Sequence, residues 1–78
     1  MEYFISSNLK FLRNQKKISQ KKIAELCKKQ NTAVANWEKG IREPSAIDLM
    51  TICEFFDISI DDFVKKDLRK ENYEKNKR

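Results

Sequence analysis

The apolar residues of this chain occur in short blocks with helical spacing, and polar segments separate the blocks. In the first block, Ile5, Leu9 and Leu12 stand at positions i, i+4 and i+7, which places them on one face of a helix. No block shows the strict alternation of apolar and polar residues that is typical of a half-buried strand. The spacing therefore predicts an all-α fold, with a first helix from about Phe4 to Lys16.

Two short helices are expected next. Ser19 is a good N-cap, and the apolar residues behind it keep the helical period, which predicts a second helix over about 20 to 27. After a polar interruption, Val34 and Trp37 resume the pattern three positions apart. This spacing predicts a third helix over about 31 to 38.

The breaks that follow predict two more helices. Gly40, the only glycine of the chain, is expected to end the third helix with a left-handed cap. Pro44 and Ser45 open a fourth helix that closes near Asp57, and a fifth starts near Ile60. The prediction is a five-helix domain.

The domain is expected to cover residues 1–64. Beyond Val64 the apolar period fades, and residues 65–78 are mostly Lys, Glu and Asn with only Leu68 and Tyr73 as large apolar residues. We expect this charged segment to be either a helical extension or a disordered tail.

Composition narrows the class of protein. A chain of 78 residues has one domain at most, with a small core that dimerisation can support. No apolar run approaches the ~20 residues that span a bilayer, and residues 1–9 lack the pattern of an export signal, so a cytoplasmic location is expected. Cys27 and Cys53 lie within apolar helical patterns and are expected to be buried thiols.

The sequence lacks the common motifs of catalytic sites. It has no histidine, no glycine-rich loop and no cysteine beside a base, so we expect no enzymatic activity and no cofactor. Two cysteines without histidine are too few ligands for a metal site.

Charge is unevenly distributed along the chain. Residues 10–42 hold ten Lys and Arg residues against Glu25 and Glu38, a net charge of +8, whereas residues 43–64 hold six acids and no base. A basic half beside an acidic half is the electrostatic pattern of a protein that binds a polyanion, although solvated surface lysines are the simpler alternative. With two short helices around a polar turn, this pattern favours a helix-turn-helix, a device for binding nucleic acid.

Several short motifs together resemble the Xre, Cro and lambda-repressor family, and the resemblance covers about Ile5 to Val64. The motifs are Leu12-Arg13, Ile18-Ser19-Gln20, Ile23-Ala24-Glu25, Val34, Trp37-Glu38-Lys39-Gly40, Pro44-Ser45 and Ile58-Ser59-Ile60-Asp61.

The resemblance implies a lambda-repressor-like domain whose motif lies at about residues 20–38, with the third helix in the major groove. Gln20 matches the family glutamine that fixes a phosphate, which suits a helix N-terminus, while a plain polar residue beside the cap is the alternative. Arg13 and Glu38 match family positions that form an ion pair, a structural role.

Helical periodicity identifies the residues expected to read bases. With Val34 and Trp37 turned inward, the third helix turns its other face outward. Asparagine pairs well with adenine, and the methyl groups of Thr and Ala suit thymine, so we expect an A·T-containing half-site. For Asn31, a role as the N-cap of the third helix is an equal alternative. The expected base-contacting residues are Asn31, Thr32, Ala35 and Asn36.

Other polar residues flank the third helix and are expected to contact phosphates, with a solvated side chain as the alternative for each lysine. They are Lys28, Lys29, Gln30, Lys39 and Arg42.

The turn departs from the family pattern. Lys28 replaces the usual glycine, Lys29 a usual apolar residue, Leu26 a usual polar one and Cys27 a usual leucine. The pattern predicts either a reshaped turn or a register shift of one residue.

The last two helices carry more apolar residues than one small domain can hide, which favours a homodimer on an inverted-repeat operator. A larger monomer core is the alternative. The expected dimer interface is Ile47, Met50, Phe55, Ile60, Phe63 and Val64.

The expected function is a sequence-specific transcriptional regulator, a repressor from a phage, mobile element or small operon. The alternatives are an antitoxin or protein-interaction module that uses its C-terminal tail, and a nonspecific DNA- or RNA-associated factor.

Overall fold

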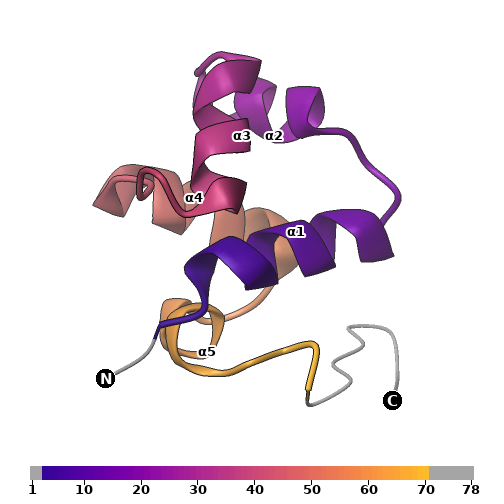
Figure 1. Ribbon diagram of the computed structural model, residues 1–78, viewed down its shortest axis with the longest axis vertical. Helices are drawn as coiled ribbons and strands as arrows, with labels where there is room; N and C mark the ends of the chain where they lie inside the picture. Colours follow the sequence, from indigo (N-terminus) through magenta and orange to yellow (C-terminus); the bar gives the residue numbers. More distant parts are fainter. Residues whose placement is uncertain (1–2, 71–78) are drawn as a thin grey trace.

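Five α-helices make up most of residues 3–70, the part of the chain that the computed structural model describes (Figure 1). The sequence prediction of an all-α, five-helix fold is confirmed, and the helices lie close to their predicted bounds. They are α1 (Ile5–Gln15), α2 (Gln20–Cys27), α3 (Asn31–Lys39), α4 (Ala46–Phe56) and α5 (Ile60–Lys65).

Serine side chains begin three of the helices. Ser19, Ser45 and Ser59 are the N-caps of α2, α4 and α5, and each accepts a hydrogen bond from a backbone N–H in the first turn. At α4, the Asp48 carboxylate in turn accepts a hydrogen bond from the backbone N–H of Ser45, which completes a capping box. At the end of α3, Gly40 adopts the predicted left-handed conformation with φ of 79°.

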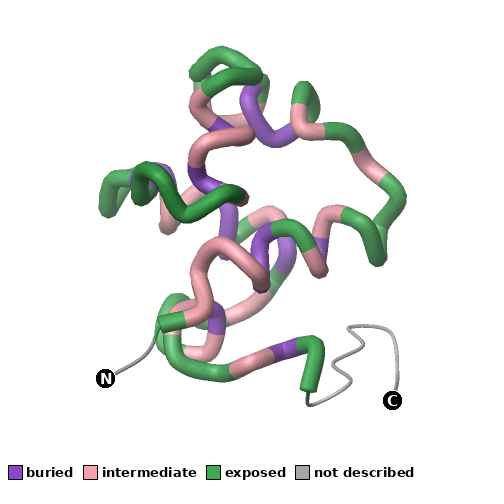
Figure 2. The backbone as a smooth tube through the Cα atoms, in the orientation of Figure 1, coloured by how far each residue is buried: buried purple, intermediate pink, exposed green. Residues whose placement is uncertain are grey.

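The core forms where the helices cross. α3 packs against α1 and α2, α4 packs against α2 and α5, and α1 also contacts α5. Figure 2 shows buried residues on the helices and exposed residues at the α1–α2 and α2–α3 turns. The buried apolar side chains are Leu9, Leu12, Ile23, Ala24, Val34, Trp37, Ile52, Cys53, Phe56, Phe63 and Leu68.

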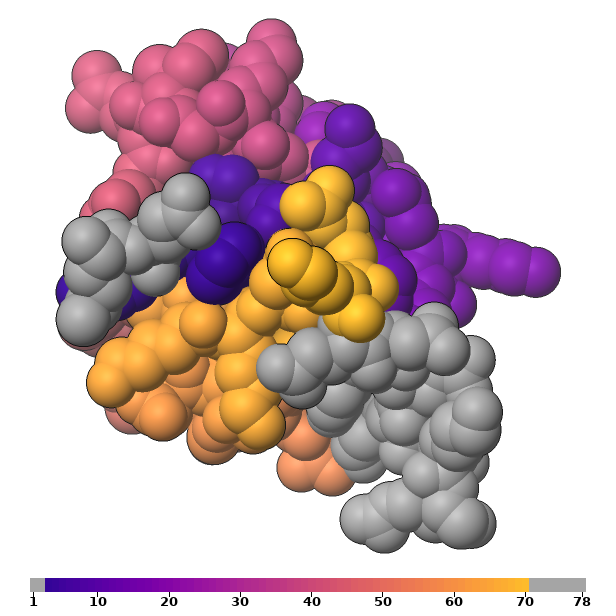
Figure 3. Space-filling model, turned by 60° about the horizontal axis from the view of Figure 1, so that its bottom comes forward, coloured from indigo at the N-terminus to yellow at the C-terminus, as the bar shows by residue number. Residues whose placement is uncertain are grey.

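A buried asparagine fastens the end of the fold to α1. Asn8 is fully buried, and its Nδ2 donates to the backbone carbonyls of Phe63 at 2.7 Å and Lys66 at 2.6 Å. Its Oδ1 accepts a bond of 3.1 Å from the backbone N–H of Leu68. These bonds satisfy backbone groups that the end of α5 leaves without helical partners. Figure 3 shows the segment after α5 lying against the first residues of α1.

The packed unit extends past the predicted boundary at Val64. Leu68 is a core residue, so residues 65–70 belong to the domain and do not form a separate tail or helical extension. The sequence signal misses this because one leucine among charged residues has no periodicity. The rest of the predicted tail, residues 71–78, lies outside the described residues.

Both cysteines are free thiols, and neither is placed for ready reaction. Cys53 is buried, and burial raises its pKa to about 11. Cys27 is half-buried, and burial with the nearby Asp48 carboxylate raises its pKa as well. The predicted burial is thus complete for Cys53 and partial for Cys27. Among residues 3–70, no helix has the length and apolar character needed to cross a membrane.

We expect Asn8→Ala to lower the free energy of unfolding by about 2–4 kcal/mol, because three backbone groups, in two buried bonds and one part-buried bond, lose their partner at once. Chemical denaturation measures this change. Asn14→Ala, on the exposed side of the same helix, is the matched control and should change stability by less than about 0.5 kcal/mol. Equal stability of the two variants would contradict the role given to Asn8.

Candidate nucleic-acid interface

The turn between α2 and α3 keeps a standard geometry although it lacks glycine. Lys28 takes the left-handed conformation with φ of 58°. The backbone N–H groups of Lys28 and Lys29 close the end of α2 on the carbonyls of Glu25 and Ala24, at 3.2 and 2.9 Å. α3 then begins at Asn31, where the sequence placed it. The expected reshaping or register shift of this turn is therefore wrong, because a lysine occupies the glycine conformation itself.

Two apolar side chains fix the orientation of α3. Val34 is fully buried and Trp37 is buried, as the helical spacing predicts. They point into the space between α1 and α2, with which α3 is in contact. The opposite side of α3 therefore has to face outward.

The residues predicted to read bases lie on this outward side. Asn31 and Thr32 are exposed, while Ala35 and Asn36 are partly exposed. The N-cap of α3 is Gln30, with an extended backbone and no side-chain capping bond, and Asn31 is the first helical residue. The alternative that Asn31 serves as the N-cap is therefore wrong, and its side chain is free of that role.

A carboxylate at the end of α3 joins three helices. Glu38 accepts hydrogen bonds from Arg13 Nε at 2.6 Å and Arg13 Nη2 at 3.1 Å, which is the predicted ion pair. The Glu38 side chain is only 5% exposed and that of Arg13 14%. The hydrogen bonds that Arg13 donates to Glu38 raise the pKa of Arg13 above its ordinary value, so the guanidinium stays charged.

Gln20 has a partner that sequence reasoning missed. Its Nε2 donates to Glu38 Oε1 at 3.0 Å, so the side chain predicted to hold a phosphate is oriented by the same carboxylate. One Nε2 hydrogen remains for a further acceptor. The sequence gives no local signal of this contact, because Gln20 and Glu38 are 18 positions apart and meet only through the packing of α2 against α3.

Lys29 differs from the other predicted phosphate-contacting residues. Its Nζ lies 3.5 Å from Asp48 Oδ2, and the Asp48 side chain is only 6% exposed. The ion pair ties the α2–α3 turn to the start of α4 and balances a charge that burial would otherwise disfavour. The Lys29 side chain is 42% exposed, so this ion pair is open to solvent on the lysine side.

The remaining predicted phosphate-contacting residues are all exposed, and no ion pair among residues 3–70 uses them. They are Lys28, Gln30, Lys39 and Arg42.

The geometry of α2, the turn and α3 agrees with a comparison against protein families. A family described as helix-turn-helix matches residues 9–63, which is most of the chain. The chain belongs to the helix-turn-helix family. The family is of the Xre and lambda-repressor type, so the resemblance seen in the sequence is confirmed.

The helix-turn-helix domain also resembles a solved structure. A crystal structure of a transcriptional regulator from Listeria innocua superposes with a TM-score of 0.80 at 26% sequence identity, covering 92% of this chain and 73% of that one. A comparison with curated protein sequences found no match.

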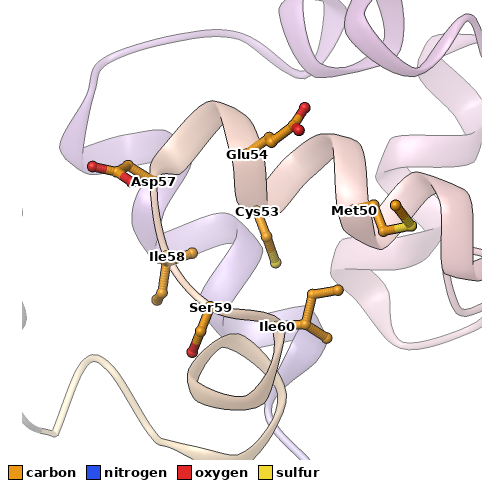
Figure 4. Close-up of a pocket in the computed structure, with 7 residues that line it drawn as sticks. All are labelled: Met50, Cys53, Glu54, Asp57, Ile58, Ser59 and Ile60. Carbon is orange, nitrogen blue, oxygen red and sulfur yellow. The ribbon is translucent and has the colours of Figure 1, made fainter.

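The predicted dimer residues do not all lie at the surface of the helix-turn-helix domain. Ile47 is 74% exposed, Met50 57% and Ile60 41%. Met50 and Ile60 line a groove of about 440 Å³ between α4 and α5 (Figure 4). Phe55 and Val64 are half-buried against the core.

Phe63 is not available to a partner. It is fully buried in the core, so its place in the predicted dimer interface is wrong. The periodicity of a six-residue helix does not distinguish a core face from an interface face. The packing of α5 against α1 determines that Phe63 belongs to the core.

We expect Lys28→Gly to raise the free energy of unfolding by about 0.5–1 kcal/mol. Glycine relieves the left-handed strain, and the greater entropy of the unfolded chain offsets part of that gain. Thermal unfolding measures this change. Lys22→Gly, inside α2 with the same loss of charge, is the control and should lower stability by about 1 kcal/mol. A loss of stability in Lys28→Gly would contradict the strain assigned to this turn.

Proposed function

We propose that this protein is a sequence-specific transcriptional regulator that acts as a repressor by occupying promoter DNA. In this proposal, α3 enters the major groove and reads bases with Asn31, Thr32, Ala35 and Asn36. The observation that carries the proposal is the outward polar face of α3, which the burial of Val34 and Trp37 fixes in place. A helix presented in this way fits the ~12 Å width of the major groove.

The surroundings of α3 support this function. Lys28, Lys39 and Arg42 are exposed at its two ends and make no ion pair within residues 3–70, so their charges are available for phosphates. Membership of the helix-turn-helix family supports DNA binding, and the Listeria innocua transcriptional regulator supports a role in regulation.

A homodimer on an inverted repeat is the second part of the proposal. The exposed Ile47, Met50 and Ile60 form an apolar surface on α4 and α5, and burial against a second copy would stabilise a small domain. Two copies related by a twofold axis would read half-sites ~34 Å apart. The interface we propose is Ile47, Met50 and Ile60, with Phe55 and Val64 at its edge.

A test of base reading compares two alanine variants on an operator selected from a random duplex pool. Asn36→Ala should weaken binding to the operator by about 1–3 kcal/mol and leave binding to unrelated DNA almost unchanged, because a base contact is lost. Lys39→Ala should weaken binding to both duplexes alike and reduce the salt slope by about 1. Fluorescence anisotropy titrations measure both effects.

The wild-type protein should bind its selected operator at least ~10³-fold more tightly than unrelated duplex. Equal affinity for both duplexes would replace the regulator proposal with the nonspecific alternative. The reverse behaviour of the two variants would overturn the roles given to Asn36 and Lys39.

A test of the dimer uses Met50→Glu, which places a third carboxylate in the groove between α4 and α5 that Glu54 and Asp57 already line. Sedimentation should show that this variant is monomeric at concentrations where the wild-type protein is dimeric, because burial disfavours a carboxylate that has no cation among the lining residues of the groove. Ile41→Glu is the matched control, since Ile41 is 66% exposed but lies in the α3–α4 loop. A dimer that survives Met50→Glu would exclude this interface.

A further inference from the structure

A cleft of about 420 Å³ lies along α1 and shares no lining residue with the groove between α4 and α5. Its volume falls within the range of ~300–1,000 Å³ that is typical of small-molecule sites. Glu38 at the end of α3 and Arg69 after α5 contribute to its walls. The lining residues from α1 are Ser6, Ser7, Lys10, Phe11 and Asn14. We call this cavity the α1 cleft.

The α1 cleft is present before any ligand binds, because Asn8 holds the segment that carries Arg69 against α1. The buried Asn8 side chain bonds the backbone of Lys66 at 2.6 Å and of Leu68 at 3.1 Å, and Leu68 is itself a core residue. Figure 3 shows this last part of the described chain packed against α1. A preformed site spares a ligand the cost of ordering the protein.

The charged side chains of the α1 cleft leave a surplus of positive charge. Lys10 is exposed and takes part in no ion pair within residues 3–70. Arg69 has a single contact of 3.5 Å, from Nε to Asp67 Oδ1, and such an exposed pair is weak. Glu38, the one acid in the lining, is 5% exposed and neutralised by Arg13 at 2.6 Å. The complementary ligand is therefore an anion.

The uncharged lining residues indicate what accompanies the anionic group. Phe11 is half-buried and provides an apolar aromatic surface in the cleft. The hydroxyl group of Ser6 and the amide group of Asn14 can donate hydrogen bonds, whereas the Ser7 hydroxyl already donates to the Phe4 carbonyl at 3.4 Å. An apolar surface beside a few polar groups favours an organic anion over an inorganic one.

We propose that the α1 cleft binds a small organic anion, a carboxylate or phosphate ester that carries one aromatic ring. Lys10 and Arg69 bind the anionic group through charge-assisted hydrogen bonds, and the ring packs on Phe11. This inference does not rest on the proposed function, since ligand binding is measured on the protein without DNA.

The test titrates the ¹⁵N-labelled protein with phenyl phosphate and follows the backbone amides by NMR. Saturable shifts are expected in residues 6–14 and 67–70, which surround the cleft. Inorganic phosphate has the same anionic group without the ring, and it should bind at least ~10-fold more weakly because no apolar surface is buried. The same comparison separates an aromatic ligand from a site for phosphate alone, whether free or in a DNA backbone.

Two variants test the cations. Lys10→Gln and Arg69→Gln should each weaken phenyl phosphate binding by about 10-fold, because a charge-assisted hydrogen bond is lost. Lys70→Gln is the matched control, since Lys70 is exposed beside Arg69 but does not line the cleft. Its affinity should stay within about twofold of the wild-type value, because a distant exposed charge is screened by salt. Thermal unfolding verifies that each variant is folded.

Three outcomes would overturn this inference. One is shifts confined to other parts of the domain, such as the groove between α4 and α5. Another is equal affinity for phenyl phosphate and inorganic phosphate. The last is an equal response of Lys10→Gln, Arg69→Gln and the Lys70→Gln control, which would indicate attraction by net charge alone. A failure of duplex binding would overturn the proposed function and leave these titrations unaffected.

Discussion

The arrangement of this protein depends on the carboxylate of Glu38. It is almost fully buried at the end of α3, and it accepts hydrogen bonds from Arg13 on α1 and Gln20 on α2. Arg13 also holds the carbonyl of Ile18 in the α1–α2 turn. A buried charge is tolerated only when it is paired and hydrogen-bonded, so loss of either partner would leave the other unsatisfied. One ion pair thereby fixes three helices and the turn, and with them the outward face of α3.

Two other buried polar side chains act at the remaining junctions. Asn8 joins α1 to the segment after α5, and Asp48 joins the start of α4 to Lys29 in the α2–α3 turn. Among residues 3–70, no buried side-chain nitrogen or oxygen atom lacks a hydrogen-bond partner. In a domain with a small core, apolar burial favours collapse but discriminates poorly between alternative packings. Directional bonds at the junctions select one packing.

The distribution of charge matches this arrangement. Lysines and arginines concentrate in residues 10–42, which include the second half of α1, α2, α3 and the turns between them, whereas residues 43–64, most of which form α4 and α5, carry acids. The two i,i+4 ion pairs, Asp61 with Lys65 and Asp62 with Lys66, neutralise part of the acidic end. Apolar anchors on the inner side of α3, and cations around its outer side that make no ion pair within residues 3–70, give the domain one face suited to a polyanion.

The sequence by itself determined the five helices, the Ser19 cap, the left-handed Gly40 and the inward anchors Val34 and Trp37, because helical period and capping depend on residues a few positions apart. Only the tertiary structure decided that Leu68 and Phe63 are core residues, that Asn8 bonds residues 63–68, that Gln20 bonds Glu38 and that Lys29 neutralises Asp48. These partners are far apart in the chain, and no local pattern records which helix faces will meet. The left-handed Lys28 belongs with them, since packing of α3 against α1 and α2 imposes a backbone that lysine disfavours on its own.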